Sequence, residues 1–173
     1  MPLTVLEKSH SPAPPHSGIR PLEAGDRERL RDLLIATERF TVEEVGIALE
    51  LIDAVLQDPD QKDYIIAVFE EAGAAAGYYC LGPTPGTEGT YDLYWIAVHP
   101  DRQGKGVGTQ LDGAAERLVR SRGGRLIIAE TSSQARYEPT REFYRRRGYA
   151  ELSRIRDYYR RGDDLVVYGK YLD

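Results

Sequence analysis

Hydrophobic residues recur along this chain with two periods, which alternate from Ile19 onward. Short apolar runs that end at glycine, proline or aspartate predict β-strands. These runs begin within 19–26 and then cover 63–71, 74–82, 91–98, 125–130, 149–159 and 164–172. Between them, apolar residues spaced as on one face of a helix predict helices that begin near Asp26, Thr41 and Gly106, and a short one over 139–147.

Capping residues mark the ends of these helices. Asp26 is expected to cap the first helix, and Thr41 with Glu44 is expected to form a capping box for the second. Gly123 and Gly124 end the third helix. These signals place the helices between the predicted strands along most of the chain.

The order of the elements predicts the fold class. The strand–helix–strand unit over 91–130 requires its two strands to be parallel. The last two strands form an antiparallel pair around 161–163. The sequence therefore predicts an α/β fold built on one mixed sheet.

The chain divides into a short tail and a single domain. Residues 1–17 are rich in proline and are expected to form a flexible tail. Residues 18–173 show no internal repeat, and we expect them to form one domain. A chain of 173 residues, of which 41% are hydrophobic, is long enough for one core.

Composition excludes several classes of function. A formal net charge of -5 argues against general nucleic-acid binding. No apolar run approaches the length of a membrane span, so no membrane partner is expected. The only cysteine, Cys80, cannot form a disulfide within the chain, which suits the cytoplasm. His10 and His16 lie in the tail, so neither a thiol–histidine pair nor a metal site is indicated.

The segment VHPDRQGKGVG, residues 98–108, joins a predicted strand to a predicted helix. Free N–H groups and the positive dipole end at the start of that helix can hold an anion, and glycines allow its close approach. A nucleoside-triphosphate loop would end in Gly-Lys-Ser/Thr, whereas here Thr109 follows Gly108 and Lys105 lies between glycines. A dinucleotide site would need G-x-G-x-x-G, whereas the spacing is G-x-G-x-G. A diphosphate site and a tight connection without ligand remain.

Several segments together resemble the GNAT superfamily of acyl-CoA-dependent N-acetyltransferases. Gln103-x-x-Gly106-x-Gly108 resembles its pyrophosphate-binding signature, IRPLEAGD its opening strand and EFYRRRGY its short helix. The resemblance runs from Ile19 to Asp173 and is closest to the ribosomal-protein alanine N-acetyltransferase branch. It implies the GNAT fold, a single mixed and mostly antiparallel sheet, flanked by helices, whose central parallel strands splay apart.

The resemblance also implies that acetyl-CoA binds between the splayed strands as acyl donor, without a metal. Its pantetheine arm would pair with the backbone of Ile96, Ala97 and Val98. Its diphosphate would lie on Arg102, Gln103, Gly104, Lys105, Gly106, Val107, Gly108 and Thr109. Arg102 and Lys105 are equally consistent with solvated loop residues.

Acyl transfer to an amine needs a base for the acceptor ammonium and an acid for the departing thiolate. By resemblance, Tyr144 is the acid, although its helical spacing also suits a core residue. Glu130 matches the base of the alanine-acetylating branch, and Asp92 matches that of histone-acetylating members. We expect Glu130 to be the base, with Asp92 as the alternative or as a partner through a water chain. Cys80 lies away from the motif, so direct attack on the thioester is favoured.

The acceptor is less clearly marked in the sequence. Candidates for an aromatic and acidic lining, each equally consistent with sheet packing, are Phe40, Glu43, Tyr94, Trp95, Asp157, Tyr158 and Tyr159. Arg141 or Arg156 is hypothesised to bind an acceptor carboxylate. The expected acceptor is a small-molecule amine, an amino-acid-like compound or a peptide N-terminus.

The chain departs from the family pattern where cofactor and acceptor would meet. The segment between Glu130 and Tyr144 is longer than in the alanine-acetylating branch, with Tyr137-Glu138-Pro139-Thr140-Arg141 in place of a run of small residues. Asp112 stands where family members usually carry an apolar residue.

Two questions stay open at this level. A catalytically silent acyl-CoA-binding sensor or interaction module is the alternative function, but such a module has little reason to keep both Glu130 and Tyr144. The last strand is a common pairing site in such domains, so both a monomer and a homodimer are compatible with the sequence.

Overall fold

The computed structural model describes residues 17–172, whose strands form one seven-stranded sheet in the order β1-β2-β3-β4-β5-β7-β6. The strands are β1 (Gly18–Pro21), β2 (Ile65–Glu71), β3 (Ala74–Pro83), β4 (Thr90–Val98), β5 (Leu126–Ser132), β6 (Ala150–Arg160) and β7 (Asp163–Tyr171). Neighbouring strands are antiparallel except β4 and β5, which are parallel as predicted. The predicted tail lies outside the described residues, apart from Ser17.

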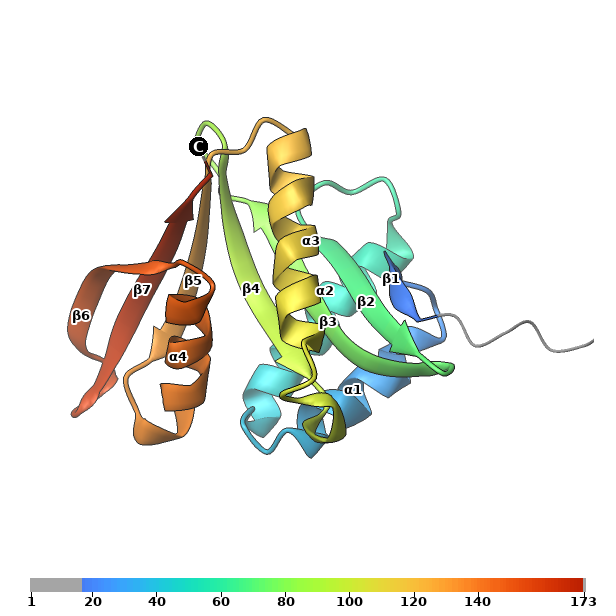
Figure 1. Cartoon of the computed structure of the whole chain (residues 1–173), viewed down its shortest axis with the longest axis horizontal. Coiled ribbons are helices and arrows are strands. Elements are labelled where there is room, and N and C mark those ends of the chain that lie inside the picture. The colour runs from blue at the N-terminus through green and yellow to red at the C-terminus, as the bar shows by residue number, and fades with distance from the viewer. Residues whose placement is uncertain (1–16, 173) are drawn as a thin grey trace, which may run out of the picture.

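Helices cover both faces of this sheet (Figure 1). They are α1 (Asp26–Ala36), α2 (Val42–Gln57), α3 (Val107–Ser121) and α4 (Glu138–Arg146), with short 3-10 turns η1 (Pro100–Arg102) and η2 (Ala135–Tyr137). α3 and α4 lie on one face, and α1 and α2 lie on the other. The expected α/β class, with a mixed and mostly antiparallel sheet flanked by helices, is confirmed.

The helix caps agree with the sequence at α2 but not at α1. The Glu44 backbone N–H donates to the Thr41 hydroxyl at 3.2 Å, and the Thr41 N–H donates to the Glu44 carboxylate at 2.7 Å, so the capping box is confirmed. Asp26 was expected to cap α1, but Gly25 occupies that position. The Asp26 carboxylate instead accepts hydrogen bonds from Arg20 of β1, at 2.6 and 2.9 Å. It also accepts from the Glu23 backbone N–H at 2.9 Å, so this carboxylate joins the start of α1 to β1.

A β-bulge in β4 reverses which side chains face each layer. Cys80 of β3 pairs with Trp95, whereas the next residue, Leu81, pairs with Leu93, so Tyr94 is the extra residue. Leu93 packs into the core under α3, and Trp95 packs against the core under α1 and α2. The bulge thus turns two consecutive aromatic residues of β4 toward one region.

The parallel contact between β4 and β5 ends beside this bulge. It pairs Thr90–Asp92 with Leu126–Ile128, although β4 continues to Val98 and β5 to Ser132. Figure 1 shows the two strands diverging from this short contact. Beyond Asp92, the backbone groups of β4 that face β5 have no partner strand, so they need hydrogen bonds from water or a ligand.

Packing on one face holds the diverging strands at a fixed separation. The core under α3 and α4 joins Leu93 of β4 to Ile127 of β5 and Tyr168 of β7. The core under α1 and α2, around Leu30 and Tyr78, involves only β2, β3 and β4. No helix among residues 17–172 is long and apolar enough to cross a bilayer.

A buried ion pair explains the unusual aspartate of α3. Arg147, which follows α4, donates to the Asp112 carboxylate at 2.7 Å, and the Tyr149 hydroxyl donates to it at 2.9 Å. Lys170 of β7 pairs with Glu116 and donates to the Arg147 carbonyl at 2.7 Å. Asp112 is therefore a buried anchor that ties α3 to the end of α4.

We predict that Asp112→Ala destabilises the fold by about 1–3 kcal/mol, because it leaves the buried Tyr149 hydroxyl and the half-buried Arg147 guanidinium without their acceptor. The free energy of unfolding in urea measures this effect. Arg31→Ala is the matched control, since Arg31 forms only exposed ion pairs on α1, and a change within about 0.5 kcal/mol is expected. Equal effects of the two substitutions would contradict the anchoring role.

Candidate active site

A cavity of about 740 Å³ lies where β4 and β5 separate. It is bounded by the two strands, the α1–α2 connection, and the segment from β5 to α4. The functional side chains along its walls include Phe40, Glu43, Glu44, Asp92, Tyr94, Trp95, Glu130, Arg136, Tyr137, Thr140, Tyr144 and Tyr159. All three predicted catalytic residues therefore line one cavity.

The two carboxylates project from the same face of the sheet. Asp92 is in register with Ile128, and Glu130 lies two residues further along β5. Since Ile127 and Ala129 face the α3–α4 core, strand alternation places Glu130 on the opposite face. The Thr84 hydroxyl donates to Asp92 at 2.8 Å and fixes that carboxylate. Partial burial and the nearby Asp92 charge raise the pKa of Glu130 above its usual range.

Tyr144 reaches the cavity from the other face. Its side chain is 4% exposed and packs against the rings of Tyr149 and Tyr168, with centroids 5.2 and 5.7 Å away. Burial, and then the negative charge of Asp112, raise the pKa of the Tyr144 phenol. The phenol therefore keeps its proton at neutral pH, as a hydrogen-bond donor must. The split sheet thus brings a tyrosine and two carboxylates together from opposite sides.

A second cavity of about 510 Å³ adjoins the glycine turn. Gly104, Gly106, Gly108, Thr109, Arg102 and Gln103 line it, together with Ile96, Val98 and the α4 residues Thr140 and Phe143. Gly104 and Gly106 have φ values of +71° and +82°, and open space surrounds both α-carbons. A Cβ on Gly108 would lie 3.1 Å from the Phe143 ring. Left-handed glycines, free helix N–H groups and an open cavity fit a diphosphate.

Other predicted cofactor residues have contacts within the protein. Arg102 pairs with Glu71, and the Lys105 ammonium donates to the Asp101 carbonyl at 2.9 Å. The Gln103 side-chain amide donates to the Val98 carbonyl at 3.1 Å, which holds the turn against β4. Val107 is buried in the core. Ile96, Ala97 and Val98 line the first cavity along the part of β4 that has no β5 partner.

The structure separates four predicted acceptor residues from both cavities. Arg141 is 6% exposed, and its guanidinium donates to the carbonyls of Ser132 and Gln134 and pairs with Glu138. These bonds use its donors to hold the β5–α4 connection, so the geometry does not support a role in binding an acceptor carboxylate. Tyr158 is not among the residues that line either cavity, nor are Asp157 and Arg156.

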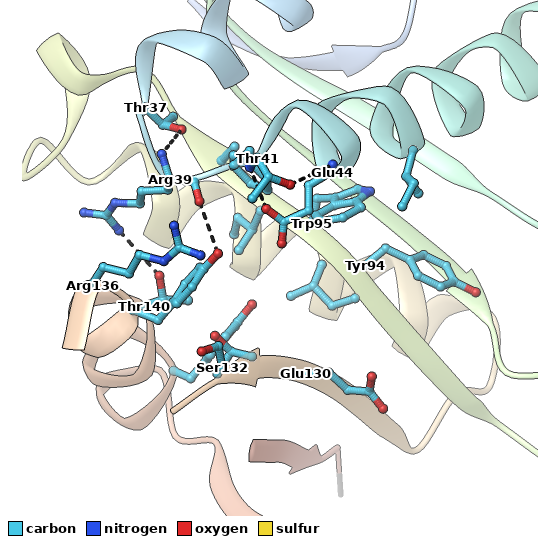
Figure 2. A pocket seen from close by; sticks show the side chains of 18 of the residues that line it. Thr37, Arg39, Thr41, Glu44, Tyr94, Trp95, Glu130, Ser132, Arg136 and Thr140 are labelled. Atoms are coloured by element: carbon cyan, nitrogen blue, oxygen red, sulfur yellow. Dashed lines mark hydrogen bonds between the residues drawn. The ribbon is translucent and has the colours of Figure 1, made fainter. Parts of the chain in front are cut away.

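Sequence reasoning did not include a contact that crosses the cleft. The Tyr137 hydroxyl donates to the Arg39 carbonyl at 3.1 Å, and the Arg39 guanidinium donates to the Thr140 hydroxyl at 3.4 Å. Figure 2 shows Arg39 and Thr140 facing each other from opposite walls. We call these three residues the cross-cleft bridge. Tyr137 and Thr140 belong to the segment that departs from the family pattern, which was the available signal in the sequence.

The bridge joins the two halves of the sheet where their own ladder is absent. Arg39 belongs to the α1–α2 connection, on the β4 side, and Tyr137 and Thr140 belong to η2 and α4, on the β5 side. Arg39 and Thr140 line both cavities. The bridge therefore lies between the carboxylate-lined cavity and the cavity at the glycine turn.

Comparisons with known proteins agree with this geometry. A family model described as Acetyltransferase (GNAT) family matches residues 27–149. A solved structure of a GNAT-family protein from Desulfovibrio desulfuricans is 41% identical, with 90% of this chain and 99% of that chain covered and a TM-score of 0.87. The chain therefore belongs to the GNAT acetyltransferase family. No curated protein matches it in sequence at a significant level.

More distant structures share the fold. The ribosomal-protein-S18-alanine N-acetyltransferase of Escherichia coli is 19% identical, with 91% of this chain and 95% of that chain covered and a TM-score of 0.73. The yncA protein of Salmonella typhimurium, solved with its cofactor acetyl-CoA, is 20% identical, with the same coverage of 91% and 95% and a TM-score of 0.71. These similarities agree with the predicted GNAT fold, in which the parallel strands β4 and β5 splay apart (Figure 1).

We predict that Tyr137→Phe loosens the cross-cleft bridge, because the phenyl ring keeps the packing but cannot donate to the Arg39 carbonyl. Hydrogen exchange of the α1–α2 connection, residues 37–41, should become about fivefold faster, as expected for the loss of one ordinary hydrogen bond. Tyr171→Phe is the matched control, since Tyr171 is exposed on β7. Unchanged exchange at 37–41 would show that the Tyr137 hydrogen bond does not hold the α1–α2 connection in place.

Proposed function

We propose that this acetyltransferase moves the acetyl group of acetyl-CoA to a primary amine by direct attack on the thioester, and that residues 18–173 act as one domain. The observation that carries the proposal is the approach of Tyr144 from one face of the sheet and of Glu130 and Asp92 from the other, into one cavity. A thioester lying in the split between β4 and β5 would have a proton donor on one side and a base on the other.

The glycine turn and the free edge of β4 supply the residues that hold the donor. The N–H groups from Gln103 to Gly108 would bind the diphosphate, and the backbone of Ile96, Ala97 and Val98 would pair with the pantetheine amides. Arg39 lines the adjoining cavity and would offset phosphate charge there, and Arg102, Arg146 and Arg147 line it while paired with carboxylates of the protein. Acetyl-CoA, when bound, supplies the activated acetyl group.

Glu130 removes the proton from the acceptor ammonium in the proposed mechanism. Its raised pKa makes it a stronger base than an exposed glutamate. Asp92, fixed by Thr84, maintains that pKa by its negative charge and can relay the proton through a water. Tyr144 holds a phenolic proton for the departing sulfur, and its apolar surroundings strengthen that hydrogen bond.

We predict that Tyr144→Phe lowers kcat by about 100-fold or more, which is the usual contribution of a positioned acid. The affinity for coenzyme A should change little, because the phenyl ring preserves the buried packing. Release of free thiol measures turnover, and calorimetry measures coenzyme A binding.

Tyr171→Phe is the control for Tyr144→Phe. It removes an exposed hydroxyl on β7 that lines neither cavity, so it should retain turnover. Wild-type turnover of Tyr144→Phe at every pH would remove Tyr144 as the acid. Coenzyme A binding without turnover on any amine in the wild-type protein would favour a silent acyl-CoA-binding module.

The pH profile of kcat separates the two carboxylates. With Glu130 as base, activity rises with pH as Glu130 loses its proton, at a pH above the range of an exposed glutamate. Glu130→Gln should abolish this rising limb. Asp92→Asn should move it to lower pH, because removing the nearby negative charge lowers the pKa of Glu130.

Glu50→Gln is the control for the pH profiles, since Glu50 lies on α2 outside the cavity and should leave the profile unchanged. Loss of the limb in Asp92→Asn, together with its retention in Glu130→Gln, would assign the base to Asp92 instead.

A further inference from the structure

We propose that the acceptor is a small amine that carries a second positive charge and no carboxylate. This inference rests on the proposed function, because it concerns the occupant of the cavity in which the amine would react. The charged side chains that line the cavity walls indicate which class of amine would bind there.

The cavity as a whole contains an excess of negative charge. Asp92, Glu130, Glu43 and Glu44 line it, and none forms a salt bridge with a residue in the described range. Asp92 accepts from the Thr84 hydroxyl, and Glu44 accepts from the Thr41 backbone. Neutral donors orient these carboxylates but leave their charge uncompensated.

The arginines that line the cavity either lie away from Glu130 or are already paired with a carboxylate. Arg160 is bonded to Asp163 at 3.4 Å. Arg39 and Arg136 lie beside Thr140, whereas Glu130 and Tyr94 lie toward the opposite end (Figure 2). Arg39 also lines the cavity at the glycine turn, where phosphate charge is expected. The guanidinium groups of the cavity therefore lie toward the cavity at the glycine turn, and the end that holds Glu130 has none of the described ones beside it (Figure 2).

This polarity selects among amines. Only one ammonium needs to lose its proton to Glu130, so a second one would remain to neutralise the other carboxylates. An acceptor carboxylate beside Glu130 and Asp92 would meet like charge, because Arg141 is held by the backbone and the guanidinium groups of Arg39 and Arg136 lie toward the other end of the cavity (Figure 2). Tyr94 and Trp95, placed together by the bulge, add aromatic surface suited to a cation.

Putrescine, butylamine and γ-aminobutyrate test this inference, because they have matched chain lengths and differ only in the group at the far end. Thiol release should give a kcat/KM about tenfold higher for putrescine than for butylamine, and lower for γ-aminobutyrate than for either. The preference should weaken as the salt concentration rises. Equal values for putrescine and butylamine, or a preference for γ-aminobutyrate, would overturn the inference while leaving acetyl transfer intact.

A pair of variants localises the effect. Glu43→Gln should reduce the ratio of putrescine to butylamine activity about fivefold, whereas Glu50→Gln, on the same helix but outside the cavity, should preserve it. An unchanged ratio in Glu43→Gln would remove Glu43 from the site.

Calorimetry on the protein loaded with coenzyme A separates this inference from the proposed function. Binding of putrescine but not of γ-aminobutyrate would support the acceptor class even if no amine were acetylated, which would overturn the proposed function alone. Binding of neither amine, or tighter binding of γ-aminobutyrate, would overturn the acceptor class.

Discussion

The interaction on which this structure depends is the short parallel ladder between β4 and β5. Its pairing stops at Asp92, beside the bulge at Tyr94, and both strands continue without each other. An interrupted ladder leaves backbone hydrogen-bonding groups unpaired inside the molecule, which is costly unless a ligand or water pairs with them. The same interruption opens the sheet so that side chains from its two faces can meet in one cavity.

Other contacts compensate for the missing ladder. The core under α3 and α4 spans the split, the pair of buried Asp112 with half-buried Arg147 fixes the end of α4, and the cross-cleft bridge joins the opposite walls. Tyr144 lies on α4, which the core under α3 and α4 holds on one side and the Asp112–Arg147 pair holds at its end. Packing and hydrogen bonds therefore set its position relative to Glu130. Asp112, which departs from the family pattern, is one of the residues that hold α4 in place.

Charge divides the site along its length. The arginines beside the bridge and the glycine turn suit phosphate groups, and the uncompensated carboxylates near Glu130 suit cationic amines. Placing like charges together costs folding free energy, and binding partners of opposite charge recovers it. Burial and then the nearby Asp92 charge raise the pKa of Glu130, so part of the field that would favour a cationic acceptor would also strengthen the proposed base.

The sequence by itself determined the order of the elements, the capping box of α2, the parallel pair and the glycine turn, because these depend on local periodicity and on backbone conformations that few residues adopt. It did not place Asp26, Arg141 or Arg39, because a charged side chain takes whichever partner the fold brings within reach. The Asp26 carboxylate accepts from Arg20 and from the Glu23 backbone, and backbone carbonyls use the donors of Arg141. The glycine turn predicts the cofactor site from local sequence, whereas only the tertiary structure decided which charges line the cavity of the proposed acceptor, since they come from segments far apart in the chain.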